Sequence, residues 1–217
     1  MRRCDAVVFD LDGTLLDTSE GISRSVRHVI KEMSLPEASD EVLRTFIGPP
    51  IQRSFERVYG LEKEEALKAA DMFRNRYKEH DILLAVPYEG IFETIEELAK
   101  AGIRSAVATY KRQDYAEKIL GHFGFDRVCD CICGSDFEQK LSKSDIIENA
   151  IRLLGINDRS RVVMIGDSDN DAEGAKGIEV PFVGVTYGFG FASKEDVNEF
   201  PNIGSAATCR DILRCVL

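Results

Sequence analysis

The chain has 217 residues, a length typical of one moderately large domain or of a core domain that carries a smaller insert. Hydrophobic residues make up 44% of it, which is enough for a buried core, and the formal net charge at pH 7 is -10. An acidic surface repels nucleic-acid backbones and anionic membranes, so we expect neither as a partner.

The first predicted strand is the short apolar run at residues 6–9, AVVF, which is apolar on both faces. From about residue 17 to about residue 84 the sequence contains no convincing strand. Helices are predicted over 19–33 and 62–80, with shorter helical pieces between them, and the GPP sequence at 48–50 forces a turn. We interpret this region as a small helical domain inserted after the first strand.

Helices and strands alternate in the rest of the chain. The sequence predicts, in chain order, a helix at 91–101, a strand at 105–108, a helix at 115–123, a strand near 131–133, a helix at 146–154 and strands at 162–165 and 182–185. This alternation predicts an α/β fold, a Rossmann-like parallel sheet with helices on both faces. The expected domains are a core formed by residues 1–16 and 85–217 and a helical cap formed by 17–84.

Two features bear on the cellular compartment. The cysteines at 129, 131 and 133 alternate as on one face of a strand and form no C-x-x-C pair, which indicates buried, reduced thiols. The sequence contains no apolar run of transmembrane length, and acidic residues interrupt any apolar leader near its start. We therefore expect a cytoplasmic protein, and the sequence gives no indication of its oligomeric state.

Polar side chains follow several predicted strands at their carboxyl ends, which is where open parallel sheets bind ligands. They are Asp10, Asp12 and Gly13 after the first strand, Thr109 and Tyr110 after the second, Lys143 before a later helix, and Asp167 and Asp171 after the strand at 162–165. Because these ends meet at one edge of one sheet, we expect hydroxyl, ammonium and carboxylate groups to converge there.

The acidic residues predict a magnesium site. Asp10 and Asp12 are two residues apart, so an extended backbone would point both side chains the same way. Two close carboxylates repel each other, and a hard divalent cation between them removes much of that cost. Asp167 and Asp171 can complete an oxygen-rich site of the kind magnesium prefers, whereas zinc would favour His or Cys.

These groups suggest a mechanism of phosphate-ester hydrolysis. Asp10 attacks phosphorus, and Asp12 protonates the leaving alkoxide and then takes a proton from the hydrolysing water. We expect Thr109 to donate a hydrogen bond to the phosphoryl group and Lys143 to supply fixed positive charge. Gly13 is expected to allow a tight turn and to let backbone N–H groups approach the phosphate.

The sequence DLDGTL at 10–15 resembles the first motif of the haloacid dehalogenase-like superfamily. Thr109 fits its second motif, Lys143 its third, and the stretch from 166 to 171 its fourth. The helical insert resembles the type 1 cap of phosphoglycolate phosphatase-like members, and residues 185–188 resemble the stretch that follows their last core strand. Residues 46–50, which include Gly48, would then form the substrate-specificity loop.

The resemblance implies a magnesium-dependent phosphatase acting on small phosphate monoesters. It implies that magnesium is held by Asp10, the Asp12 main-chain carbonyl and Asp167. One departure concerns the third motif, which is Lys-Pro in many members, whereas here Ser144 follows Lys143 and a second lysine, Lys140, lies nearby.

Taken singly, each residue has a simpler interpretation. Thr109 alone would be an ordinary strand-end residue, Lys143 a solvated lysine, and Asp167 or Asp171 a helix cap. The assignment depends on their occurring together and in order. Tyr110 could serve a local turn as well as a substrate.

Other functions fit parts of the same pattern. A sugar-phosphate mutase would need a second phosphate clamp, which the largely apolar 46–50 loop does not offer, and a dehalogenase would leave Asp12 unexplained. A non-enzymatic receiver-type domain has its phosphorylated Asp after a later strand and lacks a helical insert. A catalytically dead scaffold would not need the functional groups of catalysis, all of which are present here. Phosphoglycolate, a nucleoside monophosphate, a sugar phosphate and pyrophosphate all remain open as substrates.

Overall fold

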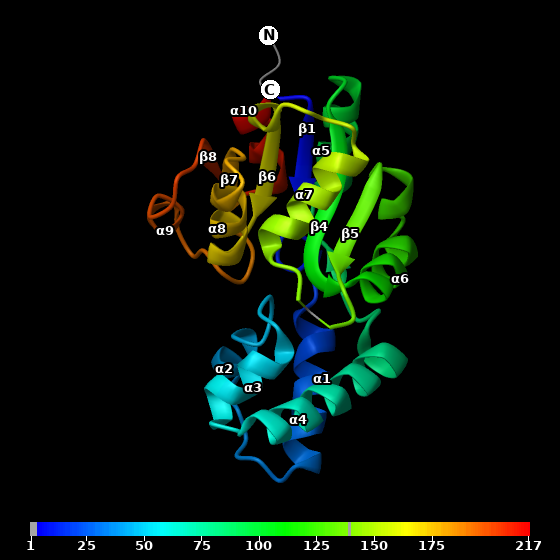
Figure 1. The fold of residues 1–217 in the computed structure, drawn as a ribbon, viewed down its shortest axis with the longest axis vertical. Helices are drawn as coiled ribbons and strands as arrows, with labels where there is room; N and C mark the ends of the chain where they lie inside the picture. Colours follow the sequence, from blue (N-terminus) through cyan, green and yellow to red (C-terminus); the bar gives the residue numbers. More distant parts are fainter. Residues whose placement is uncertain (1–3, 139) are drawn as a thin grey trace. The chain divides into compact units, whose positions relative to one another are not determined.

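The computed structural model describes residues 4–138 and 140–217, and the chain divides into two compact units (Figure 1). The first unit combines Met1–Leu16 with Pro87–Leu217, and the second is Asp17–Val86. The chain passes between them at two short strands, β2 (Leu16–Asp17) and β3 (Val86–Pro87), which pair as a two-stranded sheet.

The first unit is built on a six-stranded parallel sheet in the order β5-β4-β1-β6-β7-β8. The strands are β1 (Ala6–Phe9), β4 (Arg104–Arg112), β5 (Cys131–Ser135), β6 (Val162–Gly166), β7 (Phe182–Val185) and β8 (Gly204–Ala206). All four residues of β1 are buried, as expected for a central strand covered on both faces. This parallel sheet confirms the predicted fold class.

Helices cover both faces of the sheet. They are α5 (Ile91–Lys100), α6 (Gln113–Phe123), α7 (Lys143–Leu153), α8 (Asp169–Gly177), α9 (Lys194–Val197) and α10 (Ile212–Val216), with short 3-10 turns at Phe125–Arg127, Arg159–Arg161 and Cys209–Asp211. Helices α7 and α8 pack against each other on one face, and α5 contacts α10 on the other (Figure 1). Ala6 and Val8 of β1 belong to the apolar core beneath α7 and α8.

The second unit is helical. It contains α1 (Ser19–Glu32), α2 (Asp40–Arg44), α3 (Ile51–Tyr59) and α4 (Lys63–Arg76), and α4 continues as a π-helix, η1 (Tyr77–Asp81). Asp81 is fully buried and its carboxylate pairs with Arg76 at 2.9 Å and accepts a hydrogen bond from Ser25 at 3.0 Å. This buried charge ties α1 to the end of η1.

Several elements differ from the predicted ones. β4 continues to Arg112, four residues past the apolar run, and α7 begins at Lys143, three residues before its first apolar position. β8 was not predicted, because its sequence, Gly-Ser-Ala, has no strand pattern. The chain re-enters the first unit at Pro87, whereas the expected boundary was residue 85.

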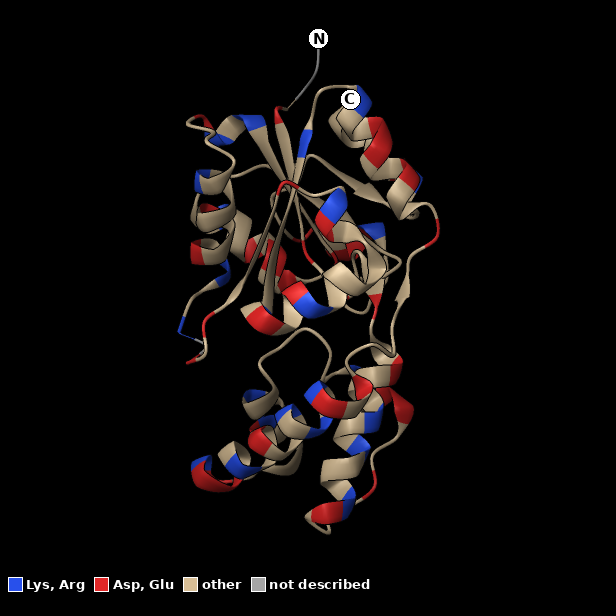
Figure 2. Ribbon diagram, turned by 90° about the vertical axis from the view of Figure 1, so that its right-hand side faces the viewer, with Lys and Arg blue, Asp and Glu red and all other residues tan. Residues whose placement is uncertain are grey.

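Charged residues are interspersed along the helices of each unit (Figure 2), whereas in the strands of the sheet they occur only at the ends of β4, as Arg104, Lys111 and Arg112. The cysteines of the chain are free thiols. Within residues 4–138 and 140–217, none of the helices combines the length and the apolar character needed to cross a bilayer.

Candidate active site

Three buried carboxylates meet at the carboxyl ends of β1 and β6. Oxygen atoms of Asp10, Asp167 and Asp171 lie within 4.8 Å of one another. Asp10 follows β1 directly, and its N–H donates to the carbonyl of Ile165 at 2.9 Å, which extends the pairing of β1 with β6. The three residues are 7%, 4% and 1% exposed, in that order, so the group is shielded from bulk water.

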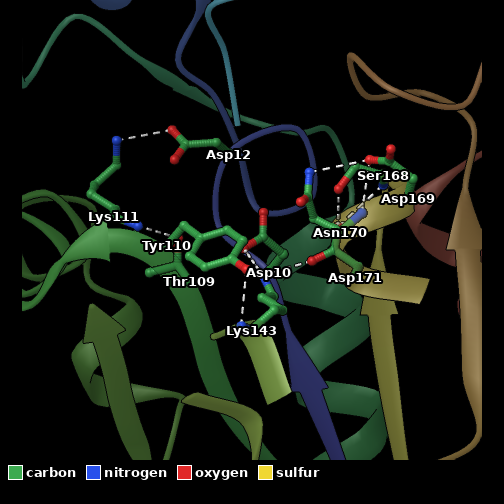
Figure 3. A network of polar contacts seen from close by, with 10 residues as sticks. All are labelled: Asp10, Asp12, Thr109, Tyr110, Lys111, Lys143, Ser168, Asp169, Asn170 and Asp171. Atoms are coloured by element: carbon green, nitrogen blue, oxygen red, sulfur yellow. Dashed lines mark hydrogen bonds and ion pairs between the residues drawn. The ribbon is translucent and has the colours of Figure 1, made fainter. Parts of the chain in front are cut away.

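Lys143 supplies the positive charge of this group. Its Nζ lies 2.6 Å from an oxygen of Asp10 and 2.6 Å from an oxygen of Asp171 (Figure 3). Lys143 is the first residue of α7, and Ser142 begins the helix with a capping box to Asp145. The rival Lys140 is exposed and pairs with Glu138, so the structure brings Lys143 to the carboxylates.

Two neighbours fix the Lys143 side chain. A Cβ on Gly174 of α8 would lie closer than 3.0 Å to Lys143 atoms, so this glycine lets the lysine stem pass between α7 and α8. The hydroxyl of Tyr110 accepts a hydrogen bond from the Lys143 N–H at 3.0 Å. Tyr110 therefore supports Lys143, and its expected contact with substrate stays a prediction.

Asp171 has two roles within the protein. One oxygen accepts hydrogen bonds from the N–H and hydroxyl of Ser168, at 3.1 and 2.7 Å, and so caps α8. The other oxygen faces Lys143. Asp171 therefore caps α8, which was the simpler interpretation of this residue, and also lies in the group with Asp10.

Asp167 is held by the loop after β7. One of its oxygens accepts hydrogen bonds from the N–H groups of Phe189 and Gly190, at 2.7 and 3.1 Å. A Cβ on Gly13, whose φ is +83°, would lie closer than 3.0 Å to the Asp167 carboxylate, and a Cβ on Gly188 would meet it as closely. A glycine is therefore required at position 13, because a side chain there would clash with the Asp167 carboxylate.

The N–H of Gly13 takes part in the turn after β1, where it donates to the carbonyl of Leu16 at 2.9 Å. The expected approach of backbone N–H groups to a phosphate stays a prediction. The turn itself, which the glycine was expected to allow, is present.

A bulge in β4 places the next group of side chains. Ala108 pairs with Cys133 and Arg112 with Ser135, so three residues of β4, Thr109 to Lys111, stand opposite one residue of β5, Gly134. Bulges of this kind redirect side chains and are frequent beside active sites. A Cβ on Gly134 would lie closer than 3.0 Å to the Lys111 carbonyl, so the bulge depends on this glycine.

Thr109 is 1% exposed, and its hydroxyl oxygen accepts a hydrogen bond from the N–H of Lys111 at 3.1 Å. Because the oxygen is used as an acceptor, the hydroxyl hydrogen is left to donate to a ligand. This arrangement is compatible with the predicted hydrogen bond from Thr109 to a phosphoryl oxygen, which stays a prediction.

Asp12 differs most from its expected position. Its carboxylate pairs with the Nζ of Lys111 at 3.0 Å and is not one of the three grouped carboxylates (Figure 3). The structure therefore does not bring the Asp12 side chain to the three carboxylates, and the part of Asp12 in holding a cation stays a prediction. The physical reason is that the backbone turns after Asp10, so the two-residue periodicity of a strand does not apply.

Gly48, which was expected to contact substrate, lies in the helical unit between α2 and α3, with a φ of +95°. The structure brings together Asp10, Lys143, Asp167 and Asp171, which come from β1, α7 and the β6–α8 segment. Sequence reasoning missed the β4 bulge, the ion pair of Lys111 and the glycines around Asp167. The glycines at 134 and 188 were the available signal, but a glycine alone does not say which side chain it accommodates.

The site has an excess of buried negative charge. Burial, opposed by Lys143 and reinforced by Asp171 and Asp12, raises the pKa of Asp10 to about 7. Burial, together with Asp171 and Asp10, raises the pKa of Asp167 to about 8 despite its two backbone hydrogen bonds. Burial lowers the pKa of Lys143, but the attraction of Asp10 and Asp171 outweighs it, so the lysine stays charged.

This donor set fits a magnesium ion. Three carboxylates against one ammonium group leave a net negative charge, which a divalent cation would compensate. Carboxylate oxygens are the ligands that magnesium prefers, and it commonly takes one or two carboxylates with water and substrate phosphate. Asp10 and Asp167 are the better placed ligands, because Asp171 is engaged by Ser168 and Lys143.

Comparison with known proteins agrees with this arrangement. The family model of haloacid dehalogenase-like hydrolases matches residues 7–185. A 5'-nucleotidase of Pseudomonas aeruginosa is 35% identical over 185 residues, 85% of this chain and 83% of that protein. A phosphoglycolate phosphatase of Agrobacterium fabrum is 33% identical over 84% of this chain and 80% of its own length. The tyrosine-protein kinase PtkA of Mycobacterium tuberculosis is 32% identical over 95% of this chain and 70% of its own length.

Solved structures have the same fold. The crystal structure of a predicted phosphatase from Clostridium acetobutylicum is 33% identical to this chain, with a TM-score of 0.89. The match covers 97% of this chain and 99% of that one. The similarity therefore extends over both the sheet and the helical insert.

Proposed function

This chain belongs to the haloacid dehalogenase-like hydrolase family, in its phosphoglycolate phosphatase-like subgroup, and we propose that it hydrolyses small phosphate monoesters with magnesium through an aspartyl phosphate on Asp10. The observation that carries the proposal is the buried pairing of Asp10 with Lys143 at 2.6 Å, beside Asp167. A nucleophilic carboxylate needs positive charge to approach an anionic ester, and this pair provides it.

The first half-reaction forms the aspartyl phosphate. An oxygen of Asp10 attacks phosphorus while the bond from phosphorus to the ester oxygen breaks. The proton of the Asp12 carboxyl moves to that leaving oxygen, and an alcohol departs. Lys143 and the Thr109 hydroxyl would stabilise the phosphoryl oxygens, a role that the 2.6 Å contact of Lys143 with Asp10 supports.

The second half-reaction releases phosphate. A water molecule gives a proton to the Asp12 carboxylate and forms a new bond to phosphorus through its oxygen. The bond between phosphorus and the Asp10 oxygen breaks, which restores the Asp10 carboxylate and leaves Asp12 protonated for the next turnover.

Magnesium would be held by the Asp10 and Asp167 carboxylates, with the Asp12 main-chain carbonyl as a further ligand, and would supply charge compensation at the phosphoryl oxygens. The raised pKa values of Asp10 and Asp167 support this proposal, because they reflect burial and the repulsion of neighbouring carboxylates, which the residues of the site do not offset.

The relatives point to a class of substrate. Their names include a 5'-nucleotidase, a phosphoglycolate phosphatase and a pyrophosphatase. We propose a small phosphate monoester such as phosphoglycolate or a nucleoside monophosphate as the substrate of this chain. Residues 17–86 would act as the cap, and the loop around Gly48 would select the ester.

The test is a panel of phosphate monoesters assayed with magnesium and with EDTA. Wild type is compared with Asp10→Asn and with Asp169→Asn, a matched control on an exposed neighbour of the site. We expect phosphate release that requires magnesium, that Asp10→Asn abolishes and that Asp169→Asn leaves within about two-fold. Activity that survives both EDTA and Asp10→Asn would refute the proposed function.

A further inference from the structure

We propose that Lys111 is a positioning residue that holds the Asp12 carboxylate in place during hydrolysis of the aspartyl phosphate. The inference rests on the proposed function and assigns a role to a residue outside the proposed set of metal and phosphate ligands. It concerns the second half-reaction, in which Asp12 must accept a proton from water.

The ion pair between the two residues is sheltered. The Nζ of Lys111 lies 3.0 Å from an oxygen of Asp12, and the side chains are only 7% and 9% exposed. An exposed Lys–Asp pair is weak because water and salt screen it, whereas a buried pair keeps its geometry. Lys111 therefore holds an oxygen of the Asp12 carboxylate in a sheltered contact.

The backbone of Lys111 is itself fixed by the β4 bulge. Its N–H donates to the hydroxyl oxygen of Thr109 at 3.1 Å. The side-chain amide of Gln113 bonds to the backbone of Ile132 and Gly134 in β5 and so replaces strand pairing that the bulge interrupts. The bulge thus places Thr109 and the lysine that orients Asp12 on one short segment.

The proposed mechanism assigns the pair to the second half-reaction. Asp12 is a carboxylate after it has given its proton to the leaving group, and the Lys111 Nζ lies 3.0 Å from one of its oxygens. In that state Lys111 prevents the carboxylate from turning away before water arrives. Two other roles are possible for Lys111, a direct contact with the substrate phosphate and a purely structural ion pair, and the experiment must separate them.

p-Nitrophenyl phosphate separates the half-reactions, because its leaving group departs without a proton. The rate constant kcat/KM then reports formation of the aspartyl phosphate, whereas kcat falls when its hydrolysis becomes slow. The variants are Lys111→Met, Lys111→Arg and the control Lys140→Met, which changes an exposed lysine. Circular dichroism and the magnesium-induced rise in Tm verify that each variant folds and binds the ion.

For Lys111→Met we expect kcat to fall by about 10-fold to 100-fold, part of the effect of a general base. KM should fall with it, so that kcat/KM stays within about two-fold, and a burst of p-nitrophenolate should precede the slow phase. Lys111→Arg should restore much of kcat, and Lys140→Met should behave as wild type. In an Asp12→Asn background, Lys111→Met should have no further effect on kcat.

Two results would overturn the inference while leaving the proposed function intact. A loss of kcat/KM as large as the loss of kcat would mean that Lys111 contacts the substrate phosphate. An unchanged kcat would mean that the ion pair is only structural. If wild type shows no Asp10-dependent turnover at all, the proposed function fails, and this inference fails with it.

Discussion

Replacing Gly13 by alanine should displace the Asp167 carboxylate. The new Cβ would lie closer than 3.0 Å to the Asp167 carboxylate, and the φ of +83° is strained for any residue with a Cβ. The strain costs about 1 kcal/mol. Displacing the carboxylate also breaks its hydrogen bonds to the N–H groups of Phe189 and Gly190, each worth about 1.5–3 kcal/mol when the acceptor is charged.

We therefore expect Gly13→Ala to lower the free energy of unfolding by about 3 kcal/mol or more, measured by urea denaturation with magnesium present. It should also weaken magnesium binding, measured by calorimetry, because a proposed ligand has moved. The change in unfolding free energy and the change in ion affinity are thus two readouts of one displacement.

Gly155 provides the matched control. Its φ is +64°, and among the described residues an added Cβ meets no atom within 4 Å. Gly155→Ala should cost only the strain, about 1 kcal/mol, and should leave magnesium binding unchanged. If Gly13→Ala costs no more than Gly155→Ala and binds magnesium as wild type does, the close packing of Gly13 against Asp167 has been misinterpreted.

Three further predictions follow from the charges. Lys143→Met leaves two buried carboxylates without their cation, so unfolding free energy should fall by about 3–5 kcal/mol, with partial recovery in the Asp10→Asn background. In EDTA, raised carboxyl pKa values favour the protonated folded state. The contribution of these two groups to stability should therefore be fully present below about pH 4 and be lost as pH rises through 7 to 8. The loss should be smaller in Asp167→Asn and with magnesium present, and a parallel profile for wild type and variant would contradict this. Asp81→Asn should lower Tm through lost bonds to Arg76 without changing magnesium affinity, checked by calorimetry.

The grouping of Asp10, Asp167 and Lys143 could be anticipated from the sequence. The carboxyl ends of adjacent parallel strands meet at one edge, and a helix that begins at Lys143 points its first turn toward that edge. These inferences need only the order of the elements, which the hydrophobic pattern reveals.

The direction of individual side chains could not be anticipated in the same way. The chain turns after Asp10, which separates the Asp12 side chain from Asp10, and the β4 bulge opposite Gly134 carries Lys111, its partner. A bulge depends on tertiary pairing that leaves no periodic signal. Tyr110, which bonds to the Lys143 N–H, lies in the same bulge. Residues two apart on an extended chain share a face only while the chain stays extended.

The central claim is that Asp10 carries the phosphoryl group during turnover. The direct measurement is mass spectrometry of peptides from enzyme that is acid-quenched while it hydrolyses a monoester in the presence of magnesium. We predict the mass increment of one phosphoryl group on the peptide that contains Asp10, and its absence with EDTA and in Asp10→Asn. Continued hydrolysis by an enzyme whose Asp10 peptide never carries phosphate would contradict the account.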